Sequence, residues 1–86
     1  MKTFDDLEFK PHWSGRGVVS RLRFANGYGV SVVRHDHSYG GPDGLYELAV
    51  LGKDGELTYT TPITSDVLGW LQPEEVSHWM QQVEQL

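Results

Sequence analysis

The stretch 18–34, VVSRLRFANGYGVSVVR, constrains the fold of this chain more than any other. Two runs rich in β-branched residues flank an Ala-Asn-Gly sequence at 25–27, and an Asn-Gly step between such runs is typical of a β-hairpin. A two-residue Asn-Gly loop would place Arg21 and Arg23 on the same face as the valines of the second run. A three-residue loop with Gly27 in the left-handed conformation separates them. Because a slip of one residue turns every side chain to the other face, the pattern favours the three-residue loop.

This register makes specific predictions for the two strands. It places Phe24 opposite Tyr28, Leu22 opposite Val30, Ser20 opposite Val32 and Val18 opposite Arg34. One face of the hairpin is then apolar, with the side chains of Val18, Leu22, Phe24, Tyr28, Val30 and Val32. The opposite face carries Arg21, Arg23 and Ser31.

A second hairpin is predicted in LYELAVLGKDGELTYTT, residues 45–61. A two-residue Asp54-Gly55 turn would pair Val50 with Tyr59 and give an apolar face of Tyr46, Leu48, Val50, Leu57 and Tyr59. Pro62 lacks an N–H group for a ladder and is expected to end the strand.

Helical signals follow the second hairpin. Residues 65–71 are expected to form a short helical turn with Thr64 or Ser65 as its cap. Pro73 suits the first position of a helix over 73–86, and two glutamates follow it at the positive end of the helix. The apolar residues of this segment recur at helical spacing and are Val76, Trp79, Met80, Val83 and Leu86.

Together these elements predict one domain over residues 1–86, a length that supports a single core. We expect an α+β fold, with an N-terminal segment (1–15), a four-stranded antiparallel meander of two hairpins (16–61), the short helical turn and the C-terminal helix packed on one face of the sheet. The other face would carry four apolar residues, Val19, Val33, Ala49 and Leu51. The N-terminal segment, a second copy or a foreign partner are the candidates to cover them.

Composition narrows the setting. The chain has no cysteine, no apolar run long enough to span a membrane and no apolar stretch of the kind found in signal peptides near its start, so we expect a cytoplasmic protein without disulfides. All seven Lys and Arg residues lie at or before Lys53, whereas residues 54–86 contain six acids. This negative field makes nucleic acid an unlikely partner and favours a basic or mixed protein surface.

Residues 34–44, RHDHSYGGPDG, contain the main candidate chemistry. In an extended chain His35 and His37 point to the same side, so both imidazoles could reach one metal ion. Zinc requires a third or fourth ligand, and Asp36 would point away. The glycine-rich part matches no phosphate-binding pattern, and Pro42-Asp43-Gly44 fits a β-turn. We therefore predict no metal, cofactor or catalytic residue here, and keep a metal site at His35 and His37 as an alternative.

Arg21 and Arg23, with Arg34 nearby, form a basic group on the open sheet face. Aromatic residues between them would indicate a platform for stacking bases, but Phe24 and Tyr28 belong to the core face. Pairing of the arginines with Glu47 on the neighbouring strand is the preferred interpretation. Weak nucleic-acid binding through the three arginines is a further alternative.

Several short strings resemble a family of small uncharacterised proteins encoded by tailed bacteriophages and prophages. The resemblance covers most of residues 16–86 and depends on Asn26-Gly27-Tyr28-Gly29, Tyr39-Gly40-Gly41, Leu45-Tyr46-Glu47 and Thr61-Pro62-Ile63-Thr64. It implies a small accessory protein in the cytoplasm of an infected bacterium. We therefore expect a non-enzymatic protein that binds another protein or itself, through the mixed sheet face around Arg21 and Arg23 or through the 35–44 loop.

Overall fold

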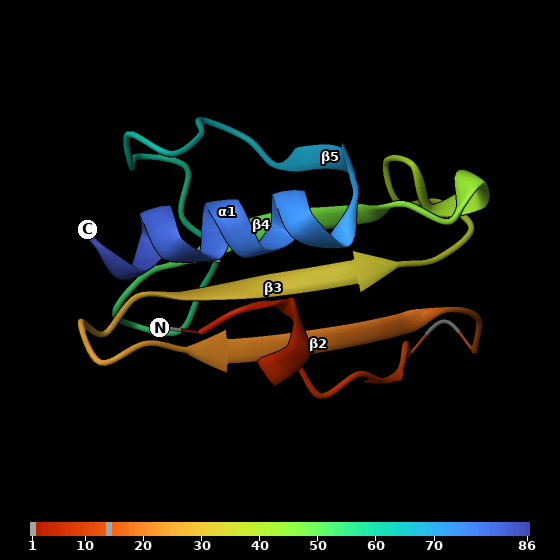
Figure 1. The fold of residues 1–86 in the computed structure, drawn as a ribbon, viewed down its shortest axis with the longest axis horizontal. Coiled ribbons are helices and arrows are strands. Elements are labelled where there is room, and N and C mark those ends of the chain that lie inside the picture. The colour runs from red at the N-terminus through yellow and green to blue at the C-terminus, as the bar shows by residue number, and fades with distance from the viewer. Residues whose placement is uncertain (1, 14) are drawn as a thin grey trace.

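The structure is a computed structural model that describes residues 2–13 and 15–86. The described residues form an antiparallel sheet whose five strands follow one another in chain order, and one α-helix crosses it (Figure 1). The elements in order are η1 (Phe4–Asp6), β1 (Lys10–Pro11), β2 (Val18–Arg23), β3 (Gly29–Arg34), η2 (Gly41–Asp43), β4 (Tyr46–Leu51), β5 (Leu68–Leu71) and α1 (Pro73–Glu84). The predicted α+β class and antiparallel meander are confirmed, but the sheet has five strands rather than four.

The first hairpin has the predicted register. Leu22 lies opposite Val30 and Ser20 opposite Val32. The Phe24 N–H donates a hydrogen bond of 2.7 Å to the Tyr28 carbonyl, so three residues form the loop. Gly27 has φ of 92°, in the left-handed region that glycine adopts without steric cost. The predicted three-residue loop is therefore confirmed.

The second hairpin differs from the prediction. The Gly52 N–H donates to the Glu56 carbonyl at 2.8 Å, and Gly55 has φ of 83°, so this turn also has three residues. A single bridge, Leu51 with Leu57, follows the turn, and residues 58–61 form no strand. The prediction of a two-residue turn and of a fourth strand reaching residue 61 was wrong. The shift by one residue turns Leu57 to the sheet face opposite the helix, where it lies beside Val33 and Ala49.

β5 pairs with the edge of β4 along which the prediction had placed residues 57–61. It lies in the region predicted to be a helical turn. Leu71 pairs with Tyr46 and Leu68 with Leu48, with a bulge between the two pairs. The prediction of helix over 65–71 was wrong because the ladder groups of β4 and the packing of Leu68 and Leu71 on the core outweigh a weak local preference. Gly69 lowers that helical preference further.

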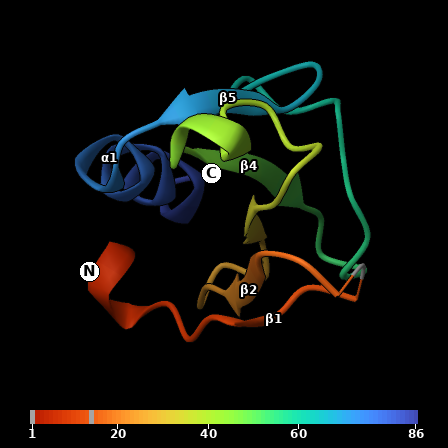
Figure 2. The same cartoon turned by 90° about the vertical axis from the view of Figure 1, so that its right-hand side faces the viewer.

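Two layers face each other across the core. α1 buries Val76, Met80 and Val83 completely against the valines of β3 and the apolar side chains of β4. The start of the N-terminal segment, with η1, lies on the same side of the sheet as α1 (Figure 2), where the Phe4 ring packs 5.0 Å from the Tyr46 ring. The end of this segment reaches the opposite face, where His12 and Trp13 line the same hollow as Val33 and Ala49, so the N-terminal segment contributes to the cover only through these two residues.

The opposite face is covered by the connection 52–67, which passes on the side of the sheet away from α1 (Figure 2). Val33, Ala49 and Leu51 are buried. The Thr58 N–H donates to the Val50 carbonyl at 2.9 Å and holds the start of this connection near β4. The connection 52–67 thus covers much of the apolar patch on this face, for which the sequence left the covering segment open.

α1 begins at Pro73, as predicted, and ends at Glu84, two residues earlier than expected. The Gln72 N–H donates to Glu75 Oε1 at 2.9 Å at the first turn. None of the helices in the described part of the chain combines the length and apolar character needed to cross a membrane.

The C-terminal end of α1 is held by the first hairpin. Asn26 Nδ2 donates to the carbonyls of Val83 and Glu84 at 2.9 and 3.0 Å, while Asn26 Oδ1 accepts the Tyr28 N–H at 3.0 Å. A third acceptor, the Leu86 carbonyl, lies at 3.3 Å. One side chain therefore both shapes the turn and satisfies carbonyls that a helix end leaves unpaired.

We predict that Asn26→Ala lowers the free energy of unfolding by about 1–3 kcal/mol, because the helix carbonyls lose their donor. Asn26→Asp should lose at least as much, since it keeps the acceptor for Tyr28 but places a negative charge at the negative end of α1. Chemical denaturation of the three proteins measures this. Wild-type stability of the Asp variant would mean that Asn26 acts only within its turn.

Candidate functional site

The connection between β3 and β4 projects from one end of the sheet (Figure 1) and is ordered by its own hydrogen bonds. The Ser38 hydroxyl is buried; it accepts the His35 N–H and donates to the His35 carbonyl, both at 3.0 Å. The segment Gly41–Asp43 forms a 3₁₀ turn that ends at left-handed Gly44. The Pro-Asp-Gly sequence is therefore used as a turn, as predicted.

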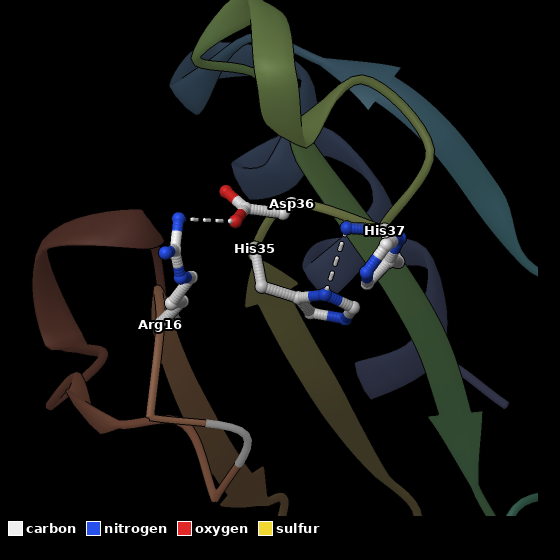
Figure 3. Close-up of polar contacts among 4 residues, drawn as sticks. All are labelled: Arg16, His35, Asp36 and His37. Carbon is white, nitrogen blue, oxygen red and sulfur yellow. Dashed lines mark hydrogen bonds and ion pairs between the residues drawn. The ribbon is translucent and has the colours of Figure 1, made fainter.

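The two histidines predicted as a possible metal pair do not converge. Figure 3 shows the His35 ring turned toward the backbone of His37, whose N–H donates to His35 Nδ1 at 3.1 Å. The ring centroids of His35 and His37 are 6.4 Å apart. Asp36 points away from both, as expected, and forms an exposed ion pair of 3.2 Å with Arg16.

The structure adds a histidine that sequence spacing did not connect with this loop. His12, next to β1, stacks on His35 with ring centroids 4.3 Å apart and on Trp13 at 3.9 Å. Stacked imidazoles present their faces to each other, whereas metal ligands direct ring nitrogens at a common point. No group of three His, Asp or Glu side chains within 2–13 and 15–86 has the geometry to hold a metal ion.

His12 is nonetheless electrostatically unusual. Its side chain is enclosed, with the whole residue 6% exposed. Burial lowers the pKa of His12 from its ordinary value of 6.5, and the neighbouring His35 lowers the pKa further. The lowered pKa favours the neutral form of the His12 ring, which stacks on both His35 and Trp13.

A second feature of the loop is an exposed aromatic pair. The rings of Tyr39, in the loop, and Trp70, in β5, stack with centroids 5.4 Å apart and planes 20° apart. The two residues are 51% and 58% exposed. Tyr39 belongs to the 35–44 loop that was predicted as a possible binding surface, but no local sequence pattern connects it with Trp70.

The backbone at this pair is arranged around the two rings. Trp70 has φ of 54°, the only positive φ of a non-glycine residue among those described. Its N–H donates to the Tyr39 carbonyl at 3.1 Å, and the Tyr39 N–H donates to Glu47 Oε1 at 3.1 Å. A Cβ atom at Gly69 would collide with the side chain of Tyr39. Two segments thirty residues apart in sequence are thus closely fitted to display Tyr39 and Trp70.

The predicted basic group is divided between the two sheet faces. Arg21 and Arg23 are exposed, and within the described chain neither forms an ion pair with a carboxylate. Glu47, their expected partner, bonds to the Tyr39 backbone instead. The Arg34 guanidinium lies on the helix side, 5.2 Å from the centre of the Tyr46 ring. Arg34 therefore does not join Arg21 and Arg23 in one surface.

Comparisons of the chain with protein-family models, with curated proteins and with solved structures gave no match. Fold and surface define a small α+β domain that displays a stacked aromatic pair at one end of its sheet. Its function has to be argued from that surface.

We predict that His12 makes the folded protein sensitive to mild acid. As the pH falls below 6.5 the unfolded chain takes up a proton at this position that the folded chain does not, so stability declines until the lower folded pKa is passed. The free energy of unfolding should fall more between about pH 7.5 and 5.5 in the wild type than in His12→Gln.

The same substitution at exposed His37 is the control, with denaturant titrations at both pH values as the measurement. If His12→Gln shows the full wild-type slope, the neutral stacked state of His12 is not the source of the pH dependence.

Proposed function

We propose that this chain is a small, non-enzymatic phage accessory protein that binds a partner protein through the Tyr39–Trp70 pair. The observation that supports this most directly is the left-handed backbone of Trp70. A bulky residue in this conformation costs roughly 1–2 kcal/mol, and such strain is typical of functional sites. The phage setting comes from the sequence resemblance alone.

The exposure of the pair supports a binding role. A tryptophan that served only to stabilise the core would be buried, yet Trp70 is 58% exposed and its ring is backed by another exposed ring. Tryptophan and tyrosine are enriched among the residues that contribute most energy to protein interfaces. Stacking also orders both rings before binding, which reduces the entropy lost on association.

The charge around the pair indicates the kind of partner. Glu47 lies beside Tyr39, Glu74 and Glu75 follow β5 at the start of α1, and residues 54–86 contain no Lys or Arg. A cationic side chain of a partner could lie over the exposed aromatic faces and near these carboxylates. A basic or mixed protein surface is therefore the partner that fits.

Neither alternative function is favoured by a specific observation. His35 Nδ1 already accepts a hydrogen bond, which weighs against a metal site built on His35 and His37. Arg34 lies on the face opposite to Arg21 and Arg23, which weighs against a nucleic-acid surface made by the three arginines. Self-association through the Tyr39–Trp70 pair is a variant of the proposal.

We predict that the variants Trp70→Ala and Trp70→Gly differ in stability. Their binding should be equally impaired, because both lack the indole ring. Trp70→Ala keeps the strained backbone without the ring contacts, whereas Trp70→Gly removes the strain, so the Gly variant should be more stable by about 1 kcal/mol. Thermal and denaturant unfolding measure this difference. A less stable Gly variant would show that position 70 is not strained.

We also predict that Tyr39→Ala and Trp70→Gly lose partners enriched by the wild type in affinity capture from bacterial lysate. Tyr59→Ala is the matched control, because Tyr59 is a similarly exposed tyrosine, at 46%, in the connection away from the pair. Quantitative mass spectrometry of the captured proteins provides the measurement. Equal enrichment by all four proteins would contradict the proposed surface, and sedimentation showing concentration-dependent dimers would assign the surface to self-association.

A further inference from the structure

A second surface lies at the opposite edge of the sheet, beside β2. A groove of about 380 Å³ is present there, lined by Glu8, Lys10, Trp13, Val19, Ser20 and Arg21, and is named here the edge groove. We propose that the edge groove binds an extended, acidic segment of a partner protein, which adds to the sheet as a strand along β2. This inference goes beyond the proposed function, because it concerns another surface and another kind of recognition.

The backbone of β2 is open along half of its outer edge. β1 pairs only through Lys10 with Val19 and Pro11 with Val18. Phe24 bonds to Tyr28, the residue before β3, and alternate residues of a strand direct their backbone groups to opposite sides. The N–H and C=O groups of Arg21 and Arg23 therefore point away from β3, and no described residue pairs with them. Unpaired groups of this kind form a template for an added strand.

The edge groove provides a wall next to this template. Before β1, Phe9 and Phe4 pack near Tyr46 on the helix side, whereas Glu8 lines the edge groove together with Arg21. Trp13, 76% exposed, also borders the edge groove. An added strand would continue the line of β1 along β2 and place alternate side chains against Trp13 and Val19.

The charges of the edge groove favour an acidic segment as its ligand. Lys10 and Arg21 line the edge groove and Arg23 follows along the same strand face, against a single acid, Glu8. Neither arginine is neutralised by an ion pair within the described chain. Acidic residues at alternate positions of an added strand would lie across from Arg21 and Arg23, where opposite charges in cross-strand pairs are favourable.

The same charges disfavour a second copy paired edge to edge. Two antiparallel β2 strands related by a two-fold axis would bring their Arg21 and Arg23 side chains across from one another, and like charges in that position are destabilising. A foreign acidic segment meets no such opposition. The occupant inferred is therefore a strand of another protein.

The test uses a synthetic peptide, acetyl-Thr-Glu-Val-Glu-Val-Glu-Val-Thr-amide, added to the full ¹⁵N-labelled chain. Backbone amide shifts should change at Arg21 and Arg23 and in β1, with weaker or no change when Gln replaces Glu in the peptide. N-methylation of the peptide amides that face β2 should abolish the shifts, because strand addition needs those donors.

Matched variants of the protein separate charge recognition from general attraction. Arg21→Gln should weaken binding about two- to fivefold, the loss expected for one cross-strand charge pair. Arg16→Gln is the control, since it removes the same charge outside the edge groove. Trp70→Gly should bind the peptide as the wild type does, so failure here and failure of the proposed function are distinguishable.

Three results would overturn the inference. One is the absence of shifts at Arg21 and Arg23 with peptide near 1 mM, a concentration at which even weak complexes form. Another is equal binding of the N-methylated peptide. The third is a set of shifts at these residues with another cause. Shifts that depend on protein concentration alone would assign the edge to self-association, and shifts that single-stranded DNA produces more strongly than the peptide would assign it to nucleic acid.

Discussion

The contact between Asn26 and the end of α1 joins the first hairpin to the helix layer of this protein. The amide of one turn residue sets the hairpin through Tyr28 and satisfies carbonyls of Val83 and Glu84, more than fifty residues later. The register of β2 and β3 then decides that Val30 and Val32 face α1 while Arg21 and Arg23 face away. The edge groove depends on this choice, because it leaves Arg21 and Arg23 outside the core.

The elements with strong local signals were predictable. The alternation of apolar and polar residues around Gly27 predicted the register of the first hairpin correctly at every residue. Pro73 predicted the start of α1, and the spacing of Val76 and Met80 predicted its buried face. The second hairpin was not predictable in this way, because an Asp-Gly sequence fits turns of two or three residues. In either register, apolar residues lie on both faces of the hairpin. Its strand was replaced by β5, whose place depends on an edge of β4 that no local pattern of residues 65–71 reveals.

The candidate site was only partly accessible from sequence for a similar reason. The loop 35–44 was predicted as a possible binding surface from its composition, and Tyr39 lies within it. Its partner Trp70 comes from a segment interpreted as helix, and a stack of two rings across thirty residues follows from tertiary structure alone. His12 and His35 are brought together in the same way by the pairing of β1 with β2.

The two edges of the sheet are unequal, and this asymmetry limits what the protein can assemble into. β5 is short and bulged, and the Trp70 N–H is already bonded to Tyr39, so this edge offers little for another strand to pair with. β2 keeps the outward backbone groups of Arg21 and Arg23 unpaired within the described chain. Continuous β-pairing from copy to copy needs two open edges on each molecule, and this sheet has open backbone groups along only one of them, which disfavours such pairing.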